Sequence, residues 1–123
     1  MKACMDRGVG VIIGAPFASG ILATGSAGAA HYAYEKPDQS IIDKVRNIES
    51  VCAAYNVSLQ DAALQFPLAH PAAVSIIPGA AKPEELIANV ASIDTDIPSA
   101  FWDELKSKGL ISPDAPVPVK FVK

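Results

Sequence analysis

The chain has 123 residues, half of them hydrophobic and 19% charged, with a formal net charge of −3. This length supports one modest globular domain, and the apolar content excludes a disordered tail. The acidic balance argues against a nucleic-acid partner, which usually leaves a basic surface. No apolar run approaches the roughly 20 residues that span a bilayer, and charges at Asp6 and Arg7 are unlike a secretory signal. We therefore expect a cytoplasmic protein without nucleic-acid or membrane partners.

The first strong element is residues 8–16, GVGVIIGAP, an apolar run rich in Val and Ile. Such a run is typical of a strand covered on both faces, as in a parallel sheet. A buried helix is the alternative, which three glycines and Pro16 disfavour. Residues 1–7 predict the last turn of a helix that leads into this strand. Residues 17–39 predict a long loop, and loops of this size are usually functional.

Two capping patterns predict helices in the middle of the chain. Ser40-x-x-Asp43 predicts a helix that begins at Ser40, and Asn56 suits its left-handed C-terminal residue. The apolar stripe of this helix recurs every three or four residues: Ile41, Val45, Ile48, Cys52 and Tyr55. Ser58-x-x-Asp61 predicts a shorter helix over residues 59–68, whose end is blurred by Pro67.

Residues 73–78, AVSIIP, predict a second buried strand, followed by Gly-Ala-Ala and another helix. Pro83 suits the first position of that helix, and the acids at Glu84 and Glu85 suit its first turn. Its expected inner face consists of Leu86, Ile87, Val90 and Ala91. A last helix is expected over about 99–108, with Phe101, Trp102 and Leu105 inside, before an extended tail with three prolines.

Strands that alternate with helices predict an α/β protein with a parallel sheet. Only two strands are convincing, and two parallel strands alone do not make a stable sheet with both faces covered. We therefore expect residues 1–123 to be a single partial domain, part of a larger assembly of strands and helices.

Two loops are candidates for ligand binding, because ligands in such folds sit beyond the carboxyl ends of strands. Residues 15–22 follow the first strand, and residues 77–82 follow the second. The second loop leads into a helix N-terminus, whose free N–H groups favour a phosphate. Ordinary connective structure is the alternative. No metal site is expected, because His31, His70 and the cysteines lack ligand spacing, and no acid, base or nucleophile constellation is recognisable.

At these two loops the sequence resembles the aldo-keto reductases. GVGVIIGAPFASGILATG is similar to their seventh-strand segment, and SLQDAALQFPLAHPAAVSIIPGAAKPEELIANV to their eighth strand and last barrel helix. The nearest resemblance is to the bacterial branch of L-fucose and D-threo-aldose 1-dehydrogenases and pyridoxal 4-dehydrogenase. It implies the C-terminal portion of a (β/α)₈ TIM barrel, with the last two strands at about 8–16 and 73–78. A closed barrel takes roughly 250 residues, so the chain is expected to be incomplete as a barrel.

The resemblance also implies a nicotinamide cofactor, NAD or NADP. The segment along the nicotinamide and pyrophosphate is matched by Ala15, Pro16, Phe17, Ser19, Gly20 and Leu22. The loop at the adenosine phosphate end is matched by Ile77, Pro78, Gly79, Ala80, Ala81 and Lys82. Glu85 and Asn89 match positions that face the adenosine, where Asn89 would hydrogen-bond the adenine.

Two departures from the family favour NAD over NADP. Members that prefer NADP often carry a cation at the position of Gly79 and an arginine at that of Glu85. Both cations are missing here, and the Glu85 carboxylate would repel a 2′-phosphate. Lys82 could partly compensate as a flexible point charge.

The family's catalytic Asp, Tyr, Lys and His all precede the matched segment, so no catalytic residue is expected in this chain. Tyr32, Tyr34 and His31 belong to a variable loop and do not replace them. We therefore expect a fragment, inactive alone, of an NAD(P)-dependent oxidoreductase that oxidises a sugar or aldehyde, such as L-fucose or D-threo-aldose at C1. One alternative is a non-catalytic nucleotide-binding module, or one that complements a missing N-terminal barrel half. Another, disfavoured by the ordered motif matches, is an unrelated small α/β protein.

Overall fold

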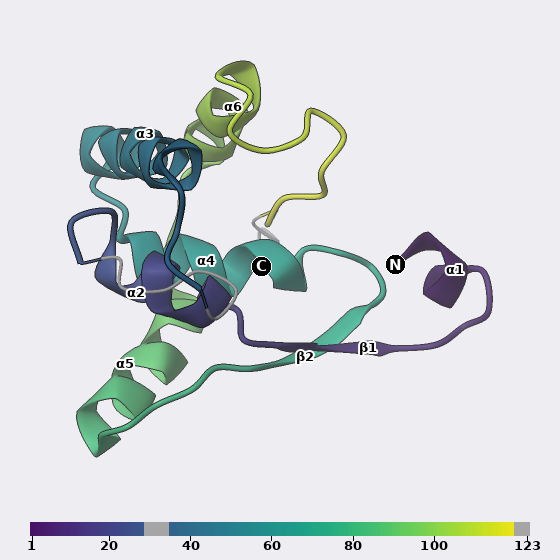
Figure 1. The fold of residues 1–123 in the computed structure, drawn as a ribbon. Helices are drawn as coiled ribbons and strands as arrows, with labels where there is room; N and C mark the ends of the chain where they lie inside the picture. Colours follow the sequence, from purple (N-terminus) through teal and green to yellow (C-terminus); the bar gives the residue numbers. More distant parts are fainter. Residues whose placement is uncertain (29–34, 120–123) are drawn as a thin grey trace.

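The computed structural model describes residues 1–28 and 35–119. Two strands, one 3₁₀ helix and six α-helices are described there, and Figure 1 shows their arrangement. In chain order they are α1 (Lys2–Met5), β1 (Val11–Gly14), η1 (Ala18–Gly20), α2 (Ile21–Thr24), α3 (Gln39–Tyr55), α4 (Leu59–Leu68), β2 (Ala73–Ile77), α5 (Pro83–Asp94) and α6 (Ser99–Ser107). Among the described residues, no helix is both long enough and apolar enough to cross a membrane.

β1 and β2 pair in parallel, as the alternation of strands and helices predicts. Val11 pairs with Ala73, and Ile13 with Ile76. The first strand is shorter than the expected 8–16. Its N-terminal side is lost because the N–H groups of Gly8 and Val9 donate to carbonyls of α1. Its C-terminal side ends where Ala15 takes a φ of 51°, a left-handed conformation that no strand continues.

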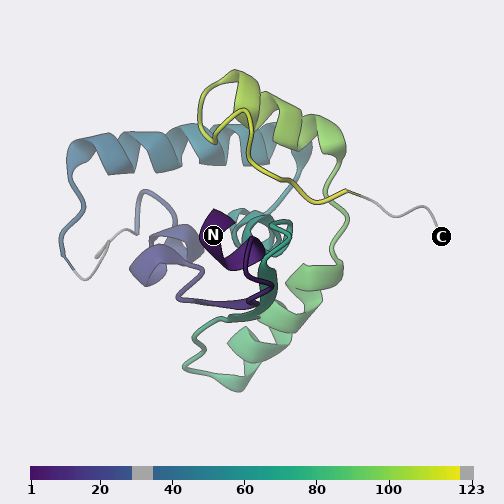
Figure 2. The same ribbon diagram turned by 90° about the vertical axis from the view of Figure 1, so that its right-hand side faces the viewer.

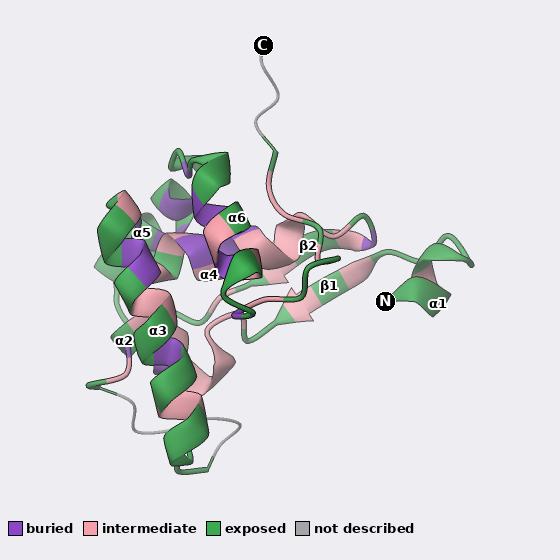
Figure 3. Cartoon of the chain, turned by 90° about the horizontal axis from the view of Figure 1, so that it is seen from above, coloured by how far each residue is buried: buried purple, intermediate pink, exposed green. Residues whose placement is uncertain are grey.

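One face of the sheet is open among the described residues, which agrees with the expectation that these two strands are part of a larger assembly. Helix α4 packs against β2, and the half-buried Ile13 and Ile76 lie together on one face. Ile12, Val74 and Ile77 are 59%, 64% and 62% exposed. Figure 3 shows how much of the two strands is exposed or only half-buried.

The core lies among the helices. α3 and α6 run side by side (Figures 1 and 2), and the aromatic rings of α6 are buried between α3 and α4. Phe101 meets Tyr55 of α3 edge-on, and Trp102 stacks on Phe66 of α4, each with ring centroids 6.0 Å apart. These contacts confirm the predicted inner face of the last helix.

Helix α3 begins one residue before the expected start, and its cap is Asp38 rather than Ser40. The Asp38 carboxylate accepts a hydrogen bond from the Ile41 N–H at 3.1 Å and one from the Ser40 hydroxyl at 2.6 Å. These two donors hold the pKa of Asp38 below its ordinary value. The other end is as predicted, because Asn56 takes a left-handed conformation with a φ of 54°. Ser58 caps α4 as predicted, accepting from the Asp61 N–H.

The expected long loop after β1 contains two short helical turns, η1 and α2. The sequence ASGILAT has too little periodicity to reveal them, and local bonds stabilise them. The Gly25 N–H donates to the Ile21 carbonyl, and the Thr24 hydroxyl donates to the Gly20 carbonyl. His31, Tyr32 and Tyr34 lie outside the described residues.

The predicted inner face of α5 is wrong. Leu86, Ile87, Val90 and Ala91 are all exposed, whereas Asn89 and Ser92 are buried. The polar face turns inward because Gln65 of α4 reaches the C-terminal end of α5. Its side-chain amide donates to the carbonyls of Ser92 and Thr95, both at 2.7 Å. The apolar face of α5 is consequently open, like that of the sheet.

Two leucine truncations on neighbouring helices test this assignment. Leu64 on α4 is 0% exposed, and Leu86 on α5 is 55% exposed. Leu64→Ala should lower the free energy of unfolding by about 2–5 kcal/mol, through lost burial and a cavity. Leu86→Ala should change it by less than about 0.5 kcal/mol, as for a surface site. Urea unfolding of the 123-residue chain measures both, and equal losses would show that the α5 face is covered.

A second prediction concerns the polar contact between α3 and α6. The Glu104 carboxylate lies 2.8 Å from both the Lys108 ammonium and the Tyr55 hydroxyl. These groups hold the pKa of Glu104 below its ordinary value. Its stabilising contribution is therefore present above the pKa of the unfolded chain, and is lost as the pH falls below about 4. Glu104→Gln should flatten the fall in thermal midpoint between neutral and acidic pH; an unchanged fall would contradict this.

Candidate cofactor site

The two candidate loops meet at one end of the sheet, because the strands that precede them are parallel. α2 and α5, which follow these loops, both lie toward that end, and α1 lies at the other (Figure 1). A cavity of about 240 Å³ opens between the loops. Four of the residues predicted from the sequence line it: Phe17 from the first loop, Gly79 from the second, and Glu85 and Asn89 from α5.

Four further residues line the cavity, and the sequence analysis did not single them out: Ala23, Thr24, Gln60 and Ala88. Ala88 could have been found, because it lies three residues after Glu85 and beside Asn89 on the same helix. Gln60 comes from α4, far away in the sequence, and no local pattern marks it. The Gln60 side-chain amide donates to the Ala23 carbonyl at 2.9 Å, which joins α4 to α2 at the cavity wall.

The other predicted residues lie in the two loops but do not line this cavity: Ala15, Pro16, Ser19, Gly20, Leu22, Ile77, Pro78, Ala80, Ala81 and Lys82. Pro78 instead lines an open apolar hollow with Leu86, Val90 and Ile93 of α5. Asn89 lines both hollows, so it stands between the cavity and the open face of α5.

The first loop has an unusual backbone. Ala15, Ala18 and Ser19 have φ values of 51°, 49° and 63°. Left-handed conformations of non-glycine residues cost on the order of 1–3 kcal/mol each, and they persist only where the surroundings hold them. Gly20 follows with a φ of 102°, which glycine adopts readily. Such strain is concentrated at ligand sites in many proteins.

The second loop is tied to the start of α5. Pro83 occupies the first position of the helix, and Glu84 and Glu85 its first turn, as predicted. The Glu85 carboxylate accepts a hydrogen bond from the Ala81 N–H at 2.7 Å. The Asn89 side-chain amide donates to the Gly79 carbonyl at 3.4 Å, a long and weak bond. One of the N–H groups expected to attract an anion is therefore already bonded to a carboxylate.

The described residues contain no group of three or more His, Cys, Asp or Glu side chains that could hold a metal ion. Cys52 is buried in the helical core. Burial, with a smaller effect of Glu49, raises the pKa of its thiol to about 11. This thiol is protonated at neutral pH and is a poor nucleophile.

Comparison with known proteins decides the family. A model of the Aldo/keto reductase family matches residues 1–109. The chain belongs to the aldo/keto reductase family. The resemblance found in the loop motifs is thereby confirmed, and the two-stranded parallel sheet with its helices is consistent with part of the family's barrel.

Two curated members of the aldo/keto reductase family agree with the branch indicated by the sequence motifs. The chain is 40% identical to a pyridoxal 4-dehydrogenase from Microbacterium luteolum, over 86% of this chain and 31% of that protein. It is 30% identical to a D-threo-aldose 1-dehydrogenase from a Pseudomonas species, over 90% of this chain and 34% of that protein. The chain thus spans about a third of the length of these relatives. Both relatives are named as dehydrogenases.

Proposed function

We propose that this chain forms the cofactor-holding part of an NAD(P)-dependent oxidoreductase. The observation that carries this proposal is that both strand-end loops line the same cavity, one through Phe17 and the other through Gly79. In (β/α)₈ enzymes the active site lies at the carboxyl ends of the strands, with a phosphate site in the last two loops. The proposal therefore assigns β1 and β2 to the last two strands of the barrel.

In this proposal, residues 15–22 bind the nicotinamide and pyrophosphate, and residues 77–82 bind the phosphate at the adenosine end. Asn89 hydrogen-bonds the adenine. Asn89 is 8% exposed and lines the cavity, and its bond to the Gly79 carbonyl is weak. The amide can therefore exchange this bond for one to a ligand at little cost. When bound, the nicotinamide supplies the acceptor of a hydride, and residues of this chain hold the dinucleotide in place.

The preferred dinucleotide is NAD. The Glu85 carboxylate is held at the loop by the Ala81 N–H and lines the cavity. A 2′-phosphate at this place would meet a negative charge, and Gly79 offers no cation to offset it. Lys82, the residue before α5, is the nearest cation in sequence.

The proposed reaction of the whole protein is oxidation of an aldose, such as L-fucose or D-threo-aldose, at C1. The name of the D-threo-aldose 1-dehydrogenase supports this substrate class. The name of the pyridoxal 4-dehydrogenase supports a dehydrogenase that acts on an aldehyde other than an aldose. The family's acid–base residues are not among those matched here, so the 123-residue chain alone should be inactive. Its location in the cytoplasm also stays a prediction.

Charge reversal at Glu85 tests the cofactor preference. Wild type should bind NADH more tightly than NADPH, measured by cofactor fluorescence. Glu85→Arg should raise the affinity for NADPH about tenfold, because a charged hydrogen bond contributes roughly 1.5–3 kcal/mol. Glu84→Arg, which makes the same charge change one residue away, is the control and should have a smaller effect. Tighter binding of NADPH by wild type would contradict the proposal.

A second candidate function is that of a half-barrel which complements a separate polypeptide. The open apolar face favours it: Ile12 and Ile77 of the strands and Leu86, Ile87 and Val90 of α5 are all more than half exposed. The accessible surface is 7810 Å², about a quarter above the ~6,300 Å² expected of a compact monomer of 12.8 kDa. The excess of about 1,500 Å² is nearly twice the roughly 800 Å² that one partner buries in a standard protein interface.

Mixing tests this second candidate. The chain should form a 1:1 complex with a polypeptide that carries the remaining part of the Microbacterium luteolum relative, measured by light scattering. Val90→Asp on the open face should abolish this complex, whereas Lys44→Asp on the exposed side of α3 should not. Dehydrogenase activity toward pyridoxal should arise only in the mixture. A chain that remains alone in the mixture, or activity without the partner, would exclude this candidate.

A further inference from the structure

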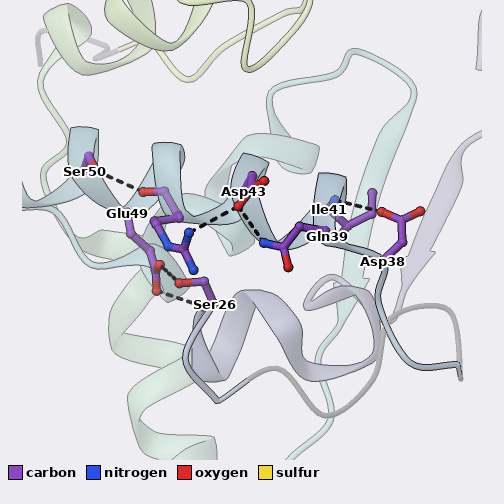
Figure 4. Close-up of polar contacts among 8 residues, drawn as sticks. Ser26, Asp38, Gln39, Ile41, Asp43, Glu49 and Ser50 are labelled. Carbon is purple, nitrogen blue, oxygen red and sulfur yellow. Dashed lines mark hydrogen bonds and ion pairs between the residues drawn. The ribbon is translucent and has the colours of Figure 1, made fainter.

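A carboxylate from α3 binds the segment that follows the first candidate loop. The Ser26 N–H donates to one oxygen of Glu49 at 3.1 Å, and the Ser26 hydroxyl donates to the other at 2.5 Å. Figure 4 shows the Glu49 side chain reaching from α3 to Ser26. The contact joins residues 23 positions apart in the sequence, so it fixes the end of α2 relative to α3.

The backbone beside this contact is shaped for the carboxylate. Gly25 is buried and has a φ of 78°, a conformation that favours glycine. A Cβ atom at Gly25 would lie 2.1 Å from a Glu49 oxygen, closer than any real contact. The absence of a side chain at Gly25 is therefore what lets Glu49 reach Ser26.

Glu49 stands next to the candidate cofactor cavity without lining it. It lines a neighbouring hollow of about 260 Å³ together with Ala23 and Thr24, and these two residues also line the cofactor cavity. Toward the N-terminus from Ser26, α2 leads to Ser19 and Ala18, which have left-handed backbone conformations. Such conformations persist only where contacts with the surrounding structure maintain them. The contact of Glu49 with Ser26 holds one end of this strained segment.

We propose that Glu49 is a positioning residue for dinucleotide binding. By holding Ser26 and the end of α2, it keeps residues 15–22 in the conformation that binds the cofactor, and it does so without touching the cofactor. This inference rests on the proposed function of the cavity. It extends the site to a residue of α3 that none of the sequence motifs includes.

Truncation of Glu49 tests the proposal. Glu49→Ala should weaken binding of NADH by about tenfold or more, and it should shift or broaden the backbone amide NMR signals of residues 15–22 in the free protein. Glu49→Gln should restore both, because its amide can accept from the Ser26 N–H and donate to the Ser26 hydroxyl. Glu104→Ala removes another carboxylate that joins two helices, and it should leave NADH binding and those signals unchanged.

The outcomes separate the two claims. Failure of wild type to bind NADH would contradict the proposed function, while the free-protein signals still test the positioning role. Binding by Glu49→Ala as in wild type, or unchanged signals of residues 15–22, would overturn the positioning role. If Glu49→Ala does not fold, Ser26→Ala replaces it, because this variant loses the hydroxyl bond alone. It should weaken NADH binding by about threefold, and unchanged binding would again overturn the proposal.

Discussion

The parallel pairing of β1 with β2 is the constraint on which the candidate site depends. Because both strands run in the same direction, residues 15–22 and 77–82 leave the sheet at the same end, although about sixty residues separate them. Helix α4 supports the pairing from one side of the sheet, and its Gln60 and Gln65 bond to α2 and α5, which carry the cavity walls.

Several helix ends could be predicted from the sequence because they depend on local signals, and the parallel pairing of the strands could be predicted because helices separate them along the chain. Asn56, Ser58 and Pro83 have the expected roles at helix ends, since each satisfies or removes backbone groups within a few residues. Asp38 caps α3 in place of Ser40. Both side chains can accept hydrogen bonds from the N–H groups at the start of the helix, and the charged Asp38 carboxylate is a stronger acceptor than the Ser40 hydroxyl.

The inner face of α5 could not be predicted in the same way. Its apolar residues, such as Leu86 and Val90, follow helical spacing, and spacing alone cannot say whether the matching surface is present. In the described structure the bonds from the Gln65 side chain to the carbonyls of Ser92 and Thr95 hold the polar face inward. The cavity could also be predicted only in part. Both loops could be identified from the sequence, but the positions of Gln60 and of the contact between Glu49 and Ser26 depend on how separate helices pack.

The central claim is that two loops far apart in the sequence form one dinucleotide site. The most direct test maps backbone amide chemical shifts of the 123-residue chain during a titration with NAD. The account predicts that the same binding curve will describe shifts in residues 15–22, in residues 77–82 and at Asn89, with little change in α6. Shifts confined to one loop, or located mainly outside both, would contradict it.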